Sequence, residues 1–385
     1  MRHLRIKNFG PIREANLKLG QVNVIIGLQS SGKSCVLKTA CYCAWVEKRI
    51  ELTQEAKAFC RGTTFIDIIA KYHNMEGYIR KDTYIEYETN HLRFSYNHSL
   101  KSFAMKWKKG HWNYKRPKIS YVPADRNLVA AIPSWSSLSL DENMLEFMSN
   151  WDKARKFVKK EENFLGLGMS YLYDSMSNSD KIQLQDGTVL MLKESSSGIQ
   201  SLLPMYVHLD YMTHGQYDDH NAKISYEQKE ELSKLWDTLY DILFKENLQA
   251  DDGKGATLES SDDTLSGREN AIRFLQAYHK FTTADHSEIF LEEPEDNLFP
   301  PTQCIFINWL LEAIQPHNDM LFVATHSPYI LNQLIKIAPK GLTVFFTHLA
   351  DDKQRMYAVR QLEENEVREI YDNGVDMFFN FELYV

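Results

Sequence analysis

The sequence lacks several features that would each indicate a class of protein. Its five cysteines include no C-x-x-C pair, so neither a zinc site nor a disulfide framework is suggested. No apolar run approaches the roughly 18 residues that a membrane helix needs, and the first residues do not resemble a signal peptide. We therefore expect a protein of the reducing cytoplasm that has no membrane partner.

Internal repeats are absent as well, and no run of heptads predicts a long coiled coil. With 43 % hydrophobic residues, the chain of 385 residues can nevertheless bury a large core. The net charge of -8 is distributed unevenly. Residues 1–120 contain 22 Lys and Arg against 9 Asp and Glu, a net charge of +13, so a basic N-terminal third is joined to an acidic body.

The most specific motif lies between residues 22 and 47. Val22–Ile26 is a β-branched apolar stretch typical of a buried strand, and Cys35–Glu47 has a helical pattern. Between them, GLQSSGKS matches G-x-x-x-x-G-K-[ST] at every fixed position. This strand, loop and helix predict a phosphate-binding loop whose residues are Gly27, Gln29, Ser30, Ser31, Gly32, Lys33 and Ser34.

The residue types of this loop suit a nucleoside triphosphate. Glycines let backbone N–H groups face the phosphates, and Lys33 brings positive charge to the β- and γ-phosphate oxygens. Ser34 offers a hydroxyl to Mg²⁺. We therefore expect ATP and Mg²⁺ as cofactors.

Two further apolar stretches end in polar residues that complete such a site. In SEIFLEEPEDNLFPP, Glu292 and Glu293 follow the predicted strand 289–291. We predict that Glu292 is a ligand of Mg²⁺ and that Glu293 polarises the attacking water. The stretch 321–324 is followed by Thr-His-Ser-Pro, which places His326 where it can sense a γ-phosphate. Glu293 and His326 are the predicted catalytic residues.

Together these segments resemble the ABC-type ATPases of the SMC/RecF group, and most closely the OLD-like ATPases of anti-phage systems such as Septu and PARIS. EEPEDNLFP resembles the Walker B motif and D-loop, and THSPYIL resembles the H-switch. The likeness covers residues 1–45, 119–126, 182–205 and 287–331. It implies an α/β fold: an ATPase head with an antiparallel β-lobe, a mostly parallel core sheet and a helical lobe.

Two stretches compete as the signature loop that such ATPases close on the γ-phosphate of a partner subunit. LSGRE, at 265–269, ends a polar tract with no strand before it, and we expect a flexible insert near 249–268. KESSSGIQSLLPMYVHL instead follows a predicted hairpin over 182–192 and opens a helix, whose N-terminus favours an anion. We therefore predict that Ser197 and Gly198 form the signature, and the serine-rich stretch resembles that of the OLD-like branch.

We expect three segments along the chain. Residues 1–120 form the β-lobe with the phosphate-binding loop, residues 121–285 form the helical lobe, and residues 286–385 complete the ATPase core. From Asp141 onward, Met144, Phe147, Met148 and Trp151 lie on one face of a predicted helix. Arg126, in YVPADRN, either contacts phosphate or pairs with a carboxylate.

The resemblance also implies partners. Two subunits would sandwich ATP head to tail, alone or within a larger assembly, and would act with a separately encoded effector such as a nuclease or toxin. The short segment after Pro328 has no acidic cluster of the Toprim nuclease type. Basic residues around two tryptophans favour DNA binding by the N-terminal lobe, with a solvated face or an acidic protein partner as alternatives. These residues are Lys101, Lys106, Trp107, Lys108, Lys109, Trp112, Lys115, Arg116 and Lys118.

Three functions fit this pattern. The first is an ATP-driven sensor or scaffold that controls an effector in anti-phage defence, and the second is a RecF-like DNA-repair ATPase that acts directly on DNA. The third is an ATPase subunit of a transporter. Transporter subunits normally have a Gly-rich signature and an Asp-Glu Walker B motif, so the Glu-Glu-Pro-Glu and Thr-His-Ser-Pro elements argue against the third.

Overall fold

The structure is a computed structural model that describes residues 2–132, 140–218, 233, 235–240, 272, 274–276, 278–337, 341–351 and 353–373. The predicted insert near 249–268, with its LSGRE stretch, lies outside the described residues.

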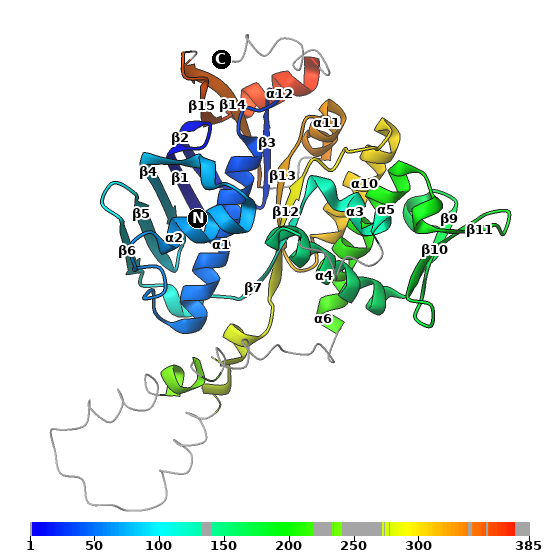
Figure 1. The fold of residues 1–385 in the computed structure, drawn as a ribbon, viewed down its shortest axis with the longest axis horizontal. Coiled ribbons are helices and arrows are strands. Elements are labelled where there is room, and N and C mark those ends of the chain that lie inside the picture. Colours follow the sequence, from blue (N-terminus) through cyan, green and yellow to red (C-terminus); the bar gives the residue numbers. More distant parts are fainter. Residues whose placement is uncertain are drawn as a thin grey trace, which may run out of the picture.

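A large mixed sheet runs through the molecule (Figure 1). Within the described residues it has 11 strands, in the order β6-β5-β4-β1-β2-β15-β14-β3-β13-β12-β7. Their bounds are β1 Arg2–Phe9, β2 Ile12–Leu19, β3 Val22–Gly27, β4 Ile79–Glu88, β5 Leu92–Asn97, β6 Ser102–Trp107, β7 Pro117–Val122, β12 His286–Glu292, β13 Met320–Ala324, β14 Leu342–Asp351 and β15 Met356–Gln361. The run β14-β3-β13-β12-β7 is parallel, whereas β2, β1, β4, β5 and β6 pair antiparallel.

Helices cover this sheet. The described α-helices are α1 Lys33–Thr53, α2 Thr64–His73, α3 Leu128–Ala131, α4 Glu142–Val158, α5 Ser197–Asp210, α6 Gln216–Asp218, α10 Pro300–Ala313, α11 Pro328–Ile337 and α12 Glu364–Asn373. Figure 1 shows α1 and α2 beside the antiparallel strands, and α4 and α5 in a separate lobe. The expected architecture of an antiparallel β-lobe, a mostly parallel core and a helical lobe is confirmed.

The parallel strands are apolar throughout because both of their faces are covered. Along β3, Val24 belongs to the core cluster on the side of α4, α5 and α10, while Ile25 belongs to the cluster on the side of α1 and α2. In β12, likewise, Leu291 belongs to the first of these clusters and Phe290 to the second. This two-sided burial holds the carboxyl ends of β3, β12 and β13 in register.

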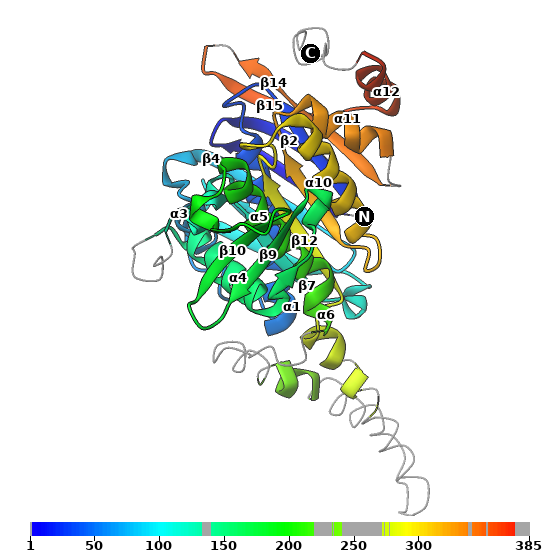
Figure 2. The ribbon, with the colours of Figure 1, turned by 90° about the vertical axis from the view of Figure 1, so that its right-hand side faces the viewer.

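The helical lobe contains a small sheet of which the sequence patterns predicted only a part. Its strands β8 Lys160–Glu161, β9 Met169–Asp174, β10 Ser179–Leu184 and β11 Val189–Met191 have the order β11-β10-β9-β8. Figure 2 labels its two central strands, β9 and β10. The predicted hairpin over residues 182–192 corresponds to β10 and β11. Strand β8 has two residues, too few for a recognisable alternation.

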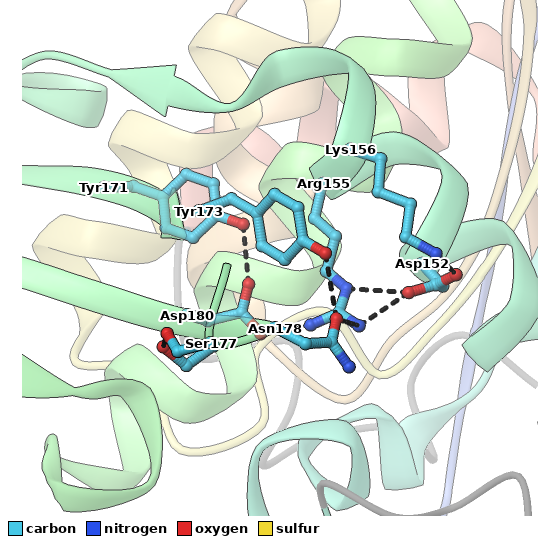
Figure 3. Close-up of polar contacts among 9 residues, drawn as sticks. Asp152, Arg155, Lys156, Tyr171, Tyr173, Ser177, Asn178 and Asp180 are labelled. Carbon is cyan, nitrogen blue, oxygen red and sulfur yellow. Dashed lines mark hydrogen bonds and ion pairs between the residues drawn. The ribbon is translucent and has the colours of Figure 1, made fainter. Parts of the chain in front are cut away.

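Arg155 links α4 to this small sheet through hydrogen bonds and ion pairs (Figure 3). Its guanidinium donates to Asp152 on the same helix at 2.6 Å, and to Asp180 at 2.8 Å and Asn178 at 3.0 Å. It also lies 4.9 Å from the centre of the Tyr173 ring. Burial lowers the pKa of Arg155, but Asp180 and Asp152 outweigh that effect and hold the pKa above its usual value.

Replacing Arg155 with Met should lower the free energy of unfolding by about 3 kcal/mol, because the largely buried Asp180 loses its cation and Asp152 keeps only the exposed Lys156. The matched control is Lys156→Met, which removes an exposed partner of the same Asp152 and should cost less than about 1 kcal/mol. Urea denaturation of the two variants measures the difference. Equal losses would show that Arg155 is no more important to the fold than a surface ion pair.

Candidate active site

The predicted phosphate-binding loop connects β3 with α1. Gly27 and Gly32 have φ values of 148° and 93°, which L side chains rarely adopt. A Cβ atom on Gly27 would lie 1.8 Å from Oγ1 of Thr347, and one on Gly32 would lie 2.5 Å from Cδ1 of Ile12. Both positions therefore require glycine, for conformation and for space.

Lys33 begins α1, and its amine lies across the loop. The amine donates to the backbone oxygens of Gly27 at 3.1 Å and Leu28 at 2.7 Å. Burial lowers the pKa of Lys33 to about 8, although Glu293 and Glu295 act in the opposite direction. These hydrogen bonds place the Lys33 ammonium where it can contact an anion bound in the loop.

The other residues of the loop divide into two groups. The hydroxyls of Ser31 and Thr347 lie 2.5 Å apart, and both are buried, so Ser31 ties the loop to β14. Gln29, Ser30 and Ser34 instead line a cavity of about 560 Å³ together with Gly32 and Lys33.

Glu293 and His326 line the same cavity. Each follows a strand of the parallel core, and β13 lies directly between β12 and β3 in the sheet. Because parallel strands present their carboxyl ends at one edge, residues from three distant parts of the sequence meet there. The structure thus brings both predicted catalytic side chains to the phosphate-binding loop.

The backbone at Glu293 has a φ of 43°, an uncommon conformation for a residue other than glycine. Arg126, fully buried, donates to the backbone oxygens of Glu292 and Glu293, both at 3.0 Å. Neither alternative expected for Arg126 describes this contact, since its partners are carbonyl groups rather than phosphate or a carboxylate. Arg126 holds the turn that presents Glu293.

The carboxylate of Glu293 lies 3.6 Å from Nε2 of His326. The nearby His326 lowers the pKa of Glu293, and the charge of Lys33 adds to this effect. Glu295 accepts from the backbone N–H of His326 at 2.5 Å and from the hydroxyl of Thr325 at 2.8 Å. Glu293 therefore faces the cavity, while Glu295 holds the segment that carries His326.

Glu292, the predicted Mg²⁺ ligand, lies deeper. Its side chain is buried, does not line the cavity, and accepts a hydrogen bond from the hydroxyl of Tyr121. Within the described ranges, no group of three or more His, Cys, Asp or Glu side chains could hold a metal ion. The Ser34 hydroxyl and the glycine-lined loop still fit a metal bound together with phosphates, because the phosphates supply oxygen ligands.

Ser197 and Gly198 begin α5, as predicted for a signature at a helix N-terminus. The preceding Ser196 caps the helix by accepting from the N–H of Ile199 at 3.4 Å. A Cβ atom on Gly198 would lie 3.0 Å from the backbone oxygen of Asn297, so α5 starts against the turn after β12. Ser197 is exposed, and neither signature residue lines the cavity.

Three cavity-lining side chains carried no sequence signal. Tyr78 ends the short 3-10 helix η1 Glu76–Tyr78, Arg80 lies in β4, and Arg355 lies between β14 and β15. The Nε of Arg80 donates to the backbone oxygen of Gly10 at 3.0 Å. No motif spacing connects these positions with the loop, so only the folded chain reveals them.

The basic cluster around Trp107 and Trp112 is only partly available. Lys108 pairs with Glu88, Lys115 with Asp285 at 3.0 Å, and Arg116 donates to the backbone of Thr282. Lys118 lines a second cavity. Three of the seven basic side chains are exposed and make no ion pair within the described part of the chain: Lys101, Lys106 and Lys109.

No family model and no curated protein matches the sequence. Among solved structures, the SMC head domain from Thermotoga maritima is 10% identical over 94% of this chain and 100% of that chain, with a TM-score of 0.42. An Smc head bound to the C-winged helix domain of ScpA is 12% identical over 95% and 98%, with a TM-score of 0.41. The recombination mediator RecF is 13% identical over 94% and 97%, with a TM-score of 0.32. Likeness at this level carries no inference about activity or partners.

Among the described helices, none is both long and apolar enough to span a bilayer.

Proposed function

We propose that this chain binds and hydrolyses ATP with Mg²⁺ as an ABC-type ATPase. One observation carries the proposal: a single cavity is lined by Lys33 and Ser34 of the phosphate-binding loop and by Glu293 and His326 from two other strand ends. Lys33 would bind the β- and γ-phosphates, and Ser34 would hold Mg²⁺, which supplies charge neutralisation. Glu292 would have to leave its hydrogen bond with Tyr121 to serve as the predicted Mg²⁺ ligand. Glu293 would orient the attacking water and accept its proton, and His326 would contact the γ-phosphate.

The remaining cavity residues fit the rest of a nucleotide. Tyr78 presents a partly exposed ring that suits a base, and Arg80 and Arg355 add two cations beside the loop. We infer that Tyr78 packs against adenine and that the arginines bind phosphate oxygens.

The direct test of the nucleotide site is Lys33→Ala. Loss of a charge-assisted contact of about 1.5–3 kcal/mol should weaken Mg·ATP binding at least about tenfold. Isothermal titration calorimetry measures the affinity. The matched control is Lys38→Ala, because Lys38 lies on the same helix but does not line the cavity. Equal affinities for the two variants would contradict the proposed role of Lys33.

We further propose that two subunits sandwich two ATP molecules head to tail, with Ser197 and Gly198 of one subunit completing the site of the other. The exposure of Ser197 at the start of α5, away from the cavity of its own chain, supports this arrangement. A helix N-terminus offers free N–H groups to a γ-phosphate. Larger assemblies would be built from such dimers.

For the biological role, we propose that ATP-driven dimerisation controls a separately encoded nuclease or toxin in anti-phage defence. The resemblance of EEPEDNLFP and THSPYIL to the OLD-like branch supports this role. Direct action on DNA, as in a RecF-like repair ATPase, is the second candidate and is favoured by the exposed lysines of the β-lobe. A nuclease or toxin gene adjacent to this one would favour the first role, and recombination genes would favour the second.

The DNA-binding hypothesis predicts that replacing Lys101, Lys106 and Lys109 together with Glu weakens duplex DNA binding more than about tenfold at low salt. The slope of log affinity against log salt should become shallower by about 0.9 for every lysine that no longer binds a phosphate. Fluorescence anisotropy at several salt concentrations measures both quantities. The control makes the same charge change at three exposed lysines of the other lobe, Lys156, Lys160 and Lys193. If wild type binds no DNA at low salt, an acidic protein becomes the expected partner of this surface.

A further inference from the structure

A second cavity, of about 350 Å³, lies away from the proposed nucleotide site. It is formed where α1 and α2, on one side of the large sheet, meet α4 near β7, the last strand of the sheet (Figure 1). Its volume falls within the range of small-molecule sites, and both lobes contribute to its walls.

Two lysines line this cavity without a direct ion pair to any described residue. Lys48 of α1 and Lys118 of β7 both line it, and neither makes an ion pair within the described residues. Burial, together with repulsion by Arg116 and Lys118, lowers the pKa of Lys48 to about 7, although Glu146 and Glu288 act in the opposite direction. Burial likewise lowers the pKa of Lys118. Burial and repulsion thus disfavour the charged forms of both lysines, and a bound anion would stabilise those forms.

The carboxylates at the cavity have other partners. Glu142 pairs with Lys71 at 2.7 Å, and Glu146 accepts from the hydroxyl of Tyr72. Both come from α4. Within the described chain neither carboxylate makes a direct hydrogen bond or ion pair with Lys48 or Lys118, although Glu146 attracts both lysines at longer range.

A buried histidine adds an unmet hydrogen-bonding group. His73 lines the cavity with 2 % of its surface exposed, and neither of its ring nitrogens has a hydrogen-bond partner in the described chain. Burial lowers its pKa to about 3, so the ring is neutral and can donate from one nitrogen and accept at the other. Buried polar groups without partners are rare, and a ligand would supply one. Trp45 adds a partly exposed flat ring to the wall.

We propose that this cavity binds a small organic anion, a phosphate or carboxylate attached to a flat ring. Lys48 and Lys118 bind the anionic group, His73 hydrogen-bonds to a polar substituent, and Trp45 packs against the ring. The ligand would thus contact α1, α2 and β7, next to α4.

Two structural elements link the walls of this cavity to the proposed active site. Tyr121 lines the cavity, and its hydroxyl donates to Glu292, the neighbour of Glu293. In addition, α1 runs from Lys33 at the phosphate-binding loop to Lys48 at the cavity. Resting on the proposed ATPase function, we infer that the bound anion changes the rate of ATP turnover.

The test uses two probes, phenyl phosphate and benzoate, with binding followed by calorimetry and by tryptophan fluorescence. We expect one probe to bind wild type with a dissociation constant below ~10 mM and to bind Lys48→Gln and Lys118→Gln at least about tenfold more weakly. The fluorescence change should disappear in Trp45→Phe. The preferred probe identifies the anionic group as phosphate or carboxylate.

Two controls separate this site from the nucleotide site. Lys18→Gln, an exposed lysine of β2, should bind the probe as wild type does, and so should Lys33→Ala, which alters the phosphate-binding loop. Absence of binding by both probes would overturn the proposal. So would binding that is unchanged in both cavity variants, or binding that Lys33→Ala abolishes.

The binding measurements require no ATP hydrolysis. The ligand site can therefore be tested even if the ATPase proposal is wrong. Coupling is tested separately: the bound probe should change ATP turnover of wild type and leave that of Lys48→Gln unchanged. Unchanged turnover in wild type with the probe bound would overturn the inferred coupling.

Discussion

Replacing Glu293 with Gln is expected to slow ATP hydrolysis about 10²-fold or more while leaving Mg·ATP binding intact. The amide keeps the size of the side chain but cannot accept a proton from water. Glu293 is the carboxylate that lines the cavity, and the nearby His326 and Lys33 keep its pKa low, so the side chain is ionised at neutral pH and can accept a proton. Phosphate release under saturating ATP measures turnover, and calorimetry measures binding.

The contrasting variant is Glu295→Gln. Both oxygens of Glu295 accept hydrogen bonds from the segment that carries His326, so this change should disturb the position of His326 rather than remove a base. Glu312→Gln, an exposed acid of α10, should have no effect. If Glu293→Gln turns over within a few-fold of wild type, another group is the base, and Glu295 becomes the first candidate.

The second large effect is expected from subunit mixing. Lys33→Ala and Ser197→Arg should each abolish turnover alone, because every site in either homodimer carries one lesion. In a mixed dimer, one site carries both lesions and the other carries none. Random pairing at equal concentrations should therefore restore about one quarter of wild-type activity, as expected for a closed two-fold assembly.

The control places both lesions in the same chain. Mixing that double variant with Lys33→Ala should restore nothing, because every phosphate-binding loop is then defective. Light scattering gives an independent measurement. ATP should double the molecular mass of the Glu293→Gln variant in solution, because that variant dimerises without hydrolysing ATP. The double variant that also carries Ser197→Arg should keep the mass of a monomer. Absence of recovery together with an unchanged mass would contradict the composite site.

Local motifs predicted the phosphate-binding loop, since strand, loop and helix are contiguous in Val22–Glu47 and their chemistry depends on spacing alone. Glu293 and His326 were also predicted locally, each as a polar residue directly after an apolar strand. The antiparallel β-lobe, the mostly parallel core and the helical lobe follow from the same patterns and from the resemblance.

The sequence did not reveal what neighbouring strands do to these residues. Arg126 has no motif that would connect it with the backbone of Glu293, and their contact exists only because β7 pairs with β12. Charge counting alone treated Lys108 and Lys115 as available to DNA, whereas the fold pairs them with Glu88 and Asp285.

The sequence by itself therefore determined which residues carry the proposed nucleotide chemistry, because those residues lie within short contiguous motifs. Only the tertiary structure decided which of them share a cavity, which charges are already paired, and that Lys48, Lys118 and His73 line a second cavity. The physical reason is that strand order and helix packing minimise the free energy of the whole chain. Contacts between distant residues thus depend on all of the core at once and leave no pattern in any one segment.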